Sequence, residues 1–205
     1  MPNDFFRVLL VDCGSRKFGD LCSLVEIRGH PWERVALDDA NKLPDRPGDA
    51  ILISGGPHLF TEPAQAEGLR RSFAFLERET RPIFGICLGF QALALAAGGE
   101  VFRGPARRTT DRLHLTLPHP LTAGLEPETE FREDHTEGVR LPASMLCLGH
   151  SDHYPAEIGA DDTRRRYGVQ FHPEVSGEPG VRILRNFFGM VERSGTPIPP
   201  SLTAS

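Results

Sequence analysis

The sequence lacks the features that bind a chain to nucleic acid or place it in a membrane. Its 205 residues hold 23 Lys and Arg against 28 Asp and Glu, a net charge of −5. Nucleic-acid binders instead need clustered positive charge to displace the counterions of the phosphates. No apolar run approaches the roughly 18 residues of a membrane span. Residues 1–7 carry an acid where a signal peptide carries basic residues. We therefore expect a soluble, cytoplasmic, globular protein.

Cysteine is scarce, with four residues at irregular positions. They form no C-x-x-C pair, which argues against a disulfide framework, a zinc ribbon and a thioredoxin-like site. We expect three of them, Cys13, Cys22 and Cys147, to be small buried hydrophobic residues. His150 and His153 flank a polar segment that offers no third strong ligand, so we expect no metal and no other cofactor.

Short apolar runs alternate with segments of helical periodicity, and this alternation is typical of an α/β fold. It predicts an open, mostly parallel, flavodoxin-like sheet with helices on both faces. The expected strands are 7–12, 34–37, 49–53, 82–86 and 167–171, and the expected helices are 21–27, 64–79, 88–97 and 181–191.

The region between residues 100 and 158 has a different character. Its short apolar pieces are interrupted by prolines, which predicts a small antiparallel extension on one edge of the sheet. We find no internal repeat, and we expect one domain over residues 1–193. Residues 194–205 are rich in Pro, Ser and Thr and are expected to form a disordered tail.

Cys87 lies in a segment with the pattern of a nucleophile elbow, residues 85–89 (GICLG). The two glycines permit a sharp strand-to-helix turn that exposes the thiol at the carboxyl edge of the sheet. The amino end of the following helix favours the thiolate, and the N–H of Leu88 would face an oxyanion. The alternative is a packed core cysteine between two incidental glycines.

A thiolate nucleophile needs a proton carrier, and His172 follows directly on the expected strand 167–171. His172 and Cys87 would then lie at the same sheet edge, although they are far apart in sequence. Glu174, two residues later and beyond the stiffening Pro173, could orient the imidazole and stabilise its charged form.

Residues 54–57 (SGGP) follow another expected strand and supply a second glycine turn at this edge. Paired glycines let a backbone N–H approach a carbonyl oxygen closely, as an oxyanion hole requires. A phosphate-binding loop is the alternative. Pro57 and His58 stand where that loop needs further donors, and no Lys-Ser or Lys-Thr follows.

Two segments together resemble the class I glutamine amidotransferases, which use a Cys-His-Glu triad. Residues 85–91 (GICLGFQ) match the family's G-x-C-x-G-x-Q, and residues 168–174 (GVQFHPE) match its G-x-Q-F-H-P-E. The likeness extends over about residues 7–190. Within the family, residues 11–15, 53–57 and 167–175 are most similar to the amidotransferase part of GMP synthases.

The resemblance implies hydrolysis of L-glutamine to glutamate and ammonia through a Cys87 thioester. His172 would move the protons and Glu174 would complete the triad. The N–H groups of Gly56 and Leu88 would contact the oxyanion and the substrate carbonyl.

The resemblance also implies a set of substrate contacts. The side chain of Gln91 would help to hold the substrate. A strip of four residues would grip its α-amino and α-carboxylate groups: Asp134, His135, Thr136 and Glu137. Thr136 and Asp134 depart from the GMP synthase pattern at two of these positions, and residues 16–17 depart from it near the first strand.

No S-G-G-x-D-S synthetase loop is present, so we expect the ammonia to pass to a separate ATP-dependent synthetase subunit, with XMP as the favoured acceptor. We also expect weak glutaminase activity without that partner. The alternatives are a subunit of anthranilate or aminodeoxychorismate synthase, a partner-independent γ-glutamyl hydrolase or peptidase, and a non-enzymatic binding protein.

Overall fold

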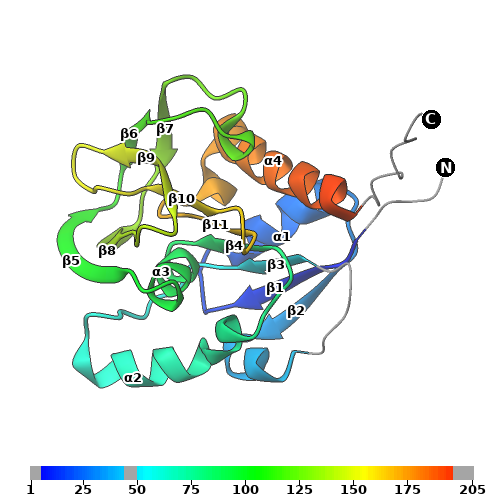
Figure 1. Ribbon diagram of the computed structural model, residues 1–205, viewed down its shortest axis with the longest axis vertical. Coiled ribbons are helices and arrows are strands. Elements are labelled where there is room, and N and C mark those ends of the chain that lie inside the picture. The colour runs from blue at the N-terminus through cyan, green and yellow to red at the C-terminus, as the bar shows by residue number, and fades with distance from the viewer. Residues whose placement is uncertain (1–5, 44–49, 196–205) are drawn as a thin grey trace, which may run out of the picture.

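A computed structural model describes residues 6–43 and 50–195. Within these residues the main sheet has nine strands in the order β2-β1-β3-β4-β11-β10-β9-β6-β7 (Figure 1). The first five in this order pair in parallel: β2 (Trp32–Ala36), β1 (Val8–Asp12), β3 (Ala50–Ile53), β4 (Ile83–Ile86) and β11 (Arg166–Val169). This is the open parallel sheet that the alternating pattern predicts.

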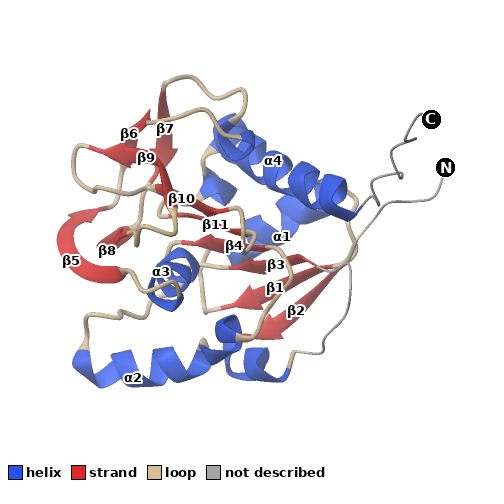
Figure 2. Ribbon diagram, viewed as in Figure 1, coloured by secondary structure: helices blue, strands red, loops and turns tan. Residues whose placement is uncertain are grey.

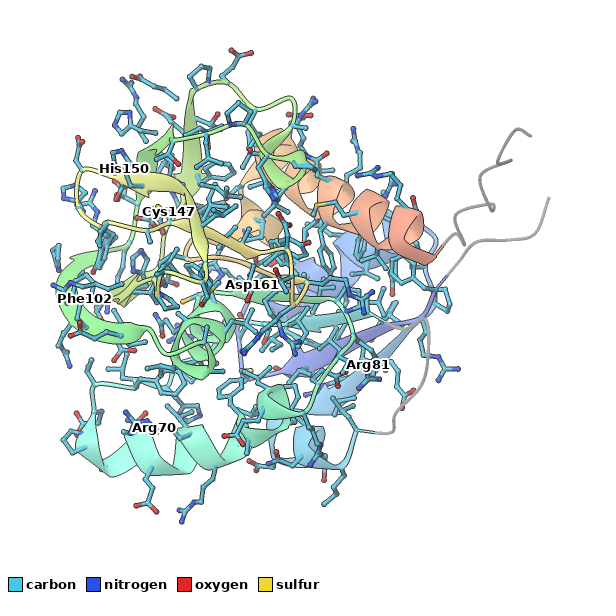
Figure 3. All side chains as sticks on the ribbon, in the orientation of Figure 1. Arg70, Arg81, Phe102, Cys147, His150 and Asp161 are labelled. Atoms are coloured by element: carbon cyan, nitrogen blue, oxygen red, sulfur yellow. The ribbon has the colours of Figure 1, made fainter. Side chains whose placement is uncertain are left out.

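The remaining strands of this sheet pair antiparallel and extend it on one side. They are β10 (Ile158–Asp161), β9 (Leu146–Ser151), β6 (Thr110–Leu115) and β7 (Glu128–Arg132). Two further strands, β5 (Glu100–Arg107) and β8 (His135–Arg140), form a separate antiparallel sheet, which the sequence pattern does not predict. Figure 3 places Phe102 of β5 and His150 of β9 on the left of the view and Arg81, just before β4, on the right.

Helices cover both faces of the parallel strands (Figure 2). Successive residues of β1 enter two different cores, because side chains alternate across a strand. Val8 and Leu10 pack with α1 (Phe18–Ile27) and α4 (Gly177–Gly195), whereas Leu9 and Val11 pack with α2 (Pro63–Ser72) and α3 (Leu88–Ala96). Short 3₁₀ turns complete the chain: η1 (Leu37–Lys42), η2 (Ala74–Glu77), η3 (Pro120–Thr122) and η4 (Pro173–Val175).

One expected helix is wrong in its extent. The segment 64–79 ends its α-helix at Ser72, and the chain then tightens into η2. Phe73, Phe75 and Leu76 are all buried, and a regular helix would turn Phe75 away from the core that holds the other two. The 3₁₀ turn brings all three side chains into the same apolar cluster.

The C-terminal helix α4 extends to Gly195, two residues into the expected tail. The rest of that tail, residues 196–205, lies outside the described residues. In the described parts of the chain, no helix combines the length and the apolar character needed to cross a membrane.

Candidate active site

Cys87 occupies a strained backbone conformation between β4 and α3. Its φ of 50° and ψ of −105° fall in a region that L-residues rarely adopt, and such strain concentrates at functional sites. The N–H of Cys87 donates to the carbonyl of Val169 at the end of β11. Leu88 begins α3, so its own N–H has no acceptor within the helix. The geometry is that of the expected elbow.

The two glycines beside Cys87 are required by close packing of the elbow. A Cβ on Gly85 would lie 2.6 Å from the carbonyl oxygen of Gly89, and one on Gly89 would lie 2.7 Å from that of Ile53. Neither glycine has a positive φ. The glycines therefore serve to bring α3 against β3 and β4 and thus to fix the direction of the Cys87 side chain.

His172 and Glu174 lie together beside Cys87, and the triad expected of the three residues stays a prediction. Nδ1 of His172 lies 2.8 Å from Oε1 of Glu174, and both side chains are almost fully buried. A Cβ placed on Gly55 would lie 2.9 Å from Cε1 of His172 and 3.4 Å from Cβ of Cys87, so the imidazole and the cysteine meet beside this glycine. Burial by itself would lower the pKa of His172, but hydrogen bonds with Cys87 and Glu174 raise it to about 9.

A chain of buried amides leads from the cysteine toward β8. Nε2 of Gln170 donates to Sγ of Cys87 at 3.6 Å, and Nε2 of Gln91 lies 3.3 Å from Oε1 of Gln170. Nε2 of Gln91 also lies 3.4 Å from the carbonyl oxygen of Glu137. No role was expected for Gln170, although it belongs to the segment 168–174 that carries the resemblance.

The turn after β3 packs against the turn after β1. Oγ of Ser54 accepts a hydrogen bond from the N–H of Cys13 and donates to the carbonyl of Gly55. A Cβ on Gly56 would lie 2.9 Å from Cδ2 of Leu88. Gly56 thus packs against the side chain of Leu88, and the role of their N–H groups as oxyanion donors stays a prediction.

These elements surround a cavity of about 840 Å³. Nine of the ten residues named from the sequence line it, and Glu174 stands behind His172. The lining from that set is Gly56, Cys87, Leu88, Gln91, Asp134, His135, Thr136, Glu137 and His172.

The side chains of the strip 134–137 make different contacts at each position. Nζ of Lys17 lies 2.5 Å from Oδ2 of Asp134. Burial raises the pKa of Asp134, but the hydrogen bond from Lys17 outweighs it, so the pKa is lowered. The carboxylate of Glu137 accepts the N–H groups of Phe60 at 3.1 Å and Thr61 at 2.6 Å. Glu137 therefore anchors the loop after Gly56, and the substrate contact expected of it stays a prediction.

The ring of His135 lies between the backbone of Glu137 and the carboxylate of Glu133. Its Nδ1 lies 2.8 Å from the carbonyl of Glu137, and its Nε2 lies 2.9 Å from Oε2 of Glu133. Burial raises the pKa of both Glu133 and Glu157 to about 8 and lowers that of His135. No motif in the sequence indicated this cluster.

Basic side chains at the cavity were also missed. Arg103 from β5 and Arg108 just after it line the cavity together with Arg16 and Lys17. Arg108 lies 3.9 Å from Asp134. Arg103 and Arg108 reach the cavity because β5 pairs with β8, and the sequence offers no spacing signal for this pairing.

The other three cysteines do not line the cavity. Burial raises the pKa of Cys13 to about 12 and also raises that of Cys22 and Cys147, which keeps them as thiols at neutral pH. All four are free.

The turn at Cys87, the buried His172–Glu174 pair and the adjacent Gly56 and Leu88 lie together at one edge of an α/β sheet. The family model of the class-I glutamine amidotransferases matches residues 9–191, and the chain belongs to this family.

Two curated relatives are glutamine-hydrolyzing GMP synthases. The chain is 36% identical over 190 residues to one subunit of the enzyme from Methanosarcina mazei, covering 89% of this chain and 95% of that protein. It is 42% identical over 142 residues to the GMP synthase of Symbiobacterium thermophilum. That match covers 67% of this chain and only 27% of the Symbiobacterium protein. The chain thus spans about a quarter of the longer relative.

The fold is shared with solved structures. A putative GMP synthase subunit from Thermoplasma acidophilum superposes with a TM-score of 0.83 at 24% identity, over 93% of this chain and 95% of that one. A glutamine amidotransferase from Thermotoga maritima gives a TM-score of 0.71 at 19% identity, over 92% and 85% of the two chains.

Proposed function

We propose that the chain is the glutaminase component of a GMP synthase-like amidotransferase. It hydrolyses L-glutamine and delivers the ammonia to a separate synthetase subunit that aminates XMP. The observation that carries this proposal is the hydrogen bond between Cys87 and His172 beside Gly55, at a cavity that Gly56 and Leu88 also line. The likeness to GMP synthase subunits of similar length supports the choice of acceptor.

In the first half of the reaction, Sγ of Cys87 attacks the side-chain amide carbon of glutamine, and His172 holds the thiol proton. The tetrahedral oxyanion accepts the N–H groups of Gly56 and Leu88. The C–N bond then breaks, and His172 gives its proton to the leaving nitrogen, so ammonia departs and a thioester remains. Glu174 stabilises the imidazolium throughout, as the third member of a triad does.

In the second half, water enters the position that ammonia has left. His172, now neutral, takes a proton from this water as the water attacks the thioester carbon. The same backbone donors hold the second oxyanion, and its collapse breaks the C–S bond. Glutamate leaves, and the proton returns to the sulfur of Cys87, so that one water is consumed in each cycle.

The synthetase partner follows from the chemistry of the product. Ammonia released at an open cavity is protonated to ammonium in water, and ammonium cannot act as the nucleophile in amination. A docked subunit that covers the cavity would retain the ammonia. We propose that this subunit uses ATP to activate its acceptor, and that both proteins act in the cytoplasm. Both statements stay predictions.

The test measures glutamate and ammonia released from L-glutamine by the purified chain, by itself and with an XMP-aminating synthetase. We expect slow hydrolysis by the chain without its partner, an increase of at least about tenfold with the partner and XMP, and transfer of ¹⁵N from the glutamine amide into GMP. Fast hydrolysis without any partner would contradict the dependence on a synthetase. Hydrolysis without nitrogen transfer would contradict the choice of acceptor.

Cys87→Ala should abolish glutamine hydrolysis, and added ammonium should restore GMP formation by the partner. Cys22→Ala is the matched control, since Cys22 lies half-buried on α1 and should leave hydrolysis unchanged. Ammonia release by Cys87→Ala would refute the nucleophile.

The volume of the cavity and the basic side chains that line it favour one second candidate, a γ-glutamyl hydrolase. A volume of about 840 Å³ lies in the range of sites that hold drug-sized ligands, about 300–1,000 Å³. Arg16, Arg103 and Arg108 line it and could accept the carboxylate of a γ-glutamyl peptide. Parallel assays of glutamine and γ-glutamyl peptides distinguish the two candidates.

A further inference from the structure

Three buried side chains converge behind the strip that lines the cavity. Glu133 follows β7, His135 begins β8, and Glu157 precedes β10. One donor atom from each lies within 4.8 Å of the other two. The side chains of Glu133 and His135 are 0% and 2% exposed, and Glu157 is 1% exposed. They form a closed cluster of two carboxylates and one imidazole, hereafter the Glu-His-Glu cluster.

Four polar atoms of this cluster have no hydrogen-bond partner among the described residues. They are both carboxylate oxygens of Glu133, Nε2 of His135 and Oε2 of Glu157. Nε2 and Oε2 of Glu133 are only 2.9 Å apart, yet their directions do not make a hydrogen bond. Buried polar atoms normally find partners, so four orphaned atoms in one cluster indicate a missing group.

The surrounding contacts orient the cluster toward that group. A carbonyl can only accept a hydrogen bond, so the contact of Nδ1 with the carbonyl of Glu137 places the His135 proton on Nδ1. The lone pair of neutral His135 is then on Nε2, facing Glu133. Oγ of Ser151 donates to Oε1 of Glu157 at 2.7 Å, which leaves Oε2 for the cluster. Metal-binding imidazoles are commonly fixed in this way through their second nitrogen.

Burying both carboxylates in their ionised form requires a cation. Two ionised carboxylates cannot be buried together without strong compensation. The nearby guanidinium of Arg107 donates hydrogen bonds from Nε and Nη2 to the carboxylate of Asp111, and its charge is thereby matched by that acid rather than by the cluster. One divalent ion would balance both glutamates.

We propose that the Glu-His-Glu cluster binds one divalent transition-metal ion, for which Zn²⁺ is the best fit. Zinc takes imidazole nitrogen and carboxylate oxygen at about 2.0–2.2 Å and commonly completes three protein ligands with water. The 2.9 Å between Nε2 of His135 and Oε2 of Glu133 is shorter than the roughly 3.4 Å between two ligands of a tetrahedral zinc, and small rotations of the glutamates would open it to that distance. The imidazole ligand selects against Mg²⁺ and Ca²⁺.

The ion has a structural role. It joins the turn between β7 and β8, which holds Glu133 and His135, to Glu157 before β10, a segment distant in sequence. Asp134 lies between two of the ligands, and Glu137 follows two residues after His135. A bound ion therefore fixes the strip 134–137 from behind. Because the cluster is closed, the ion enters during folding and is retained through purification.

The experiment is metal analysis of the untagged chain, expressed with added zinc and dialysed, by inductively coupled plasma mass spectrometry. We expect about one equivalent of zinc or a similar transition metal per chain. Glu157→Gln, which preserves shape, should retain less than about a tenth of an equivalent. Its Tm should fall by about 5–10 °C relative to the metal-bound chain, and added zinc should not raise it.

The alternative to a bound metal is a metal-free cluster in which both glutamates are protonated. The direction of the Tm change in Glu157→Gln distinguishes the two. In a metal-free cluster, Glu157→Gln replaces a neutral acid with a neutral amide, and the Tm stays equal or rises. A chain with less than a tenth of an equivalent of any transition metal, together with such a Tm, overturns the proposal. Glu133→Gln repeats the test at the second carboxylate.

The matched control is the double variant His150→Gln/His153→Gln, which removes the nearby histidines of the polar segment on and after β9. It should keep the full equivalent of metal and the same Tm. Loss of metal in this variant with retention in Glu157→Gln would place the metal on the surface and refute the cluster as its site.

Discussion

His172 and Glu174 are joined by a contact of 2.8 Å between Nδ1 and Oε1, although only one residue separates them in sequence. Pro173 starts the 3₁₀ turn η4 between them, and this turn folds the carboxylate back onto the ring. A carbonyl or carboxylate at Nδ1 fixes the tautomer whose Nε2 can exchange a proton with a nucleophile. The orientation of the His172 ring thus depends on three consecutive residues, 172–174.

Glu174→Gln tests this dependence. The amide can present its NH₂ to Nδ1, and it cannot stabilise the imidazolium, so kcat for glutamine should fall by about 10²- to 10⁴-fold. KM should change little, because Glu174 does not line the cavity. Steady-state kinetics measure both. Glu178→Gln, an exposed glutamate on α4 paired with Arg182, should behave as the wild type, and equal losses in the two variants would contradict the assignment.

The pH dependence of activity should follow the raised pKa of His172. The imidazolium protonates the leaving ammonia, so kcat/KM should fall as the pH rises through about 9. In Glu174→Gln this basic limb should move to lower pH, because one of the hydrogen bonds that raise the pKa is lost. An NMR titration of His172 provides an independent value. An unshifted histidine titrating near 6.5 would contradict the ion-paired site.

The raised pKa of His172 also makes the free energy of unfolding depend on pH. The folded protein holds this proton more tightly than the unfolded chain, whose histidine titrates near 6.5. The contribution to the free energy of unfolding, up to about 3 kcal/mol, is therefore complete below pH 6.5 and is lost as the pH rises through about 9. It is measured as the difference between wild type and His172→Gln across that range.

Gly55→Ala tests the close approach of the triad. The new Cβ would lie 2.9 Å from Cε1 of His172 and would displace the imidazole from Cys87. A shift of this order should lower kcat by about 10- to 100-fold while the fold persists, as circular dichroism and the Tm would show. Gly68→Ala is the control: its Cβ meets nothing within 4 Å on α2. It should raise the free energy of unfolding by about 0.5–1 kcal/mol without affecting kcat.

The sharp turn at Cys87 and the proximity of His172 and Glu174 to it could be predicted because their signals are local. Two glycines around Cys87 reflect contacts with Gly89 and Ile53 that leave no room for a Cβ. The end of each parallel strand falls on one sheet edge, so a strand followed by a histidine places that histidine near the cysteine. Chain connectivity and steric exclusion are enough to predict this part of the site.

The remainder depends on pairings without a sequence signature. Arg103 reaches the cavity only because β5 pairs with β8 in a separate small sheet. The Glu-His-Glu cluster combines Glu133 and His135 with Glu157. Strand β9 lies between these two parts of the chain, and their spacing matches no known ligand motif. Carboxylate side chains are expected to face solvent, and only the packed fold shows that Glu133 and Glu157 are buried.

Glu137 illustrates how a residue expected to touch the substrate can act through the backbone. Its two carboxylate oxygens accept the N–H groups of Phe60 and Thr61. In Glu137→Gln one of these donors would face an NH₂ group, which leaves a buried donor without an acceptor and costs about 1–3 kcal/mol. We expect faster hydrogen exchange in residues 57–61, a lower Tm, and a fall in kcat as well as a rise in KM, because this loop follows Gly56.

Glu130→Gln supplies the charge-matched control for this variant, since Glu130 is exposed on β7 and should leave exchange, Tm and kinetics unchanged. The two roles of Glu137 predict different outcomes. If the carboxylate only held the α-amino group of glutamine, Glu137→Gln would raise KM alone, and the exchange rates of residues 57–61 without substrate would match those of the wild type. That result would contradict the anchoring role, whereas faster exchange in the substrate-free protein would establish it independently of catalysis.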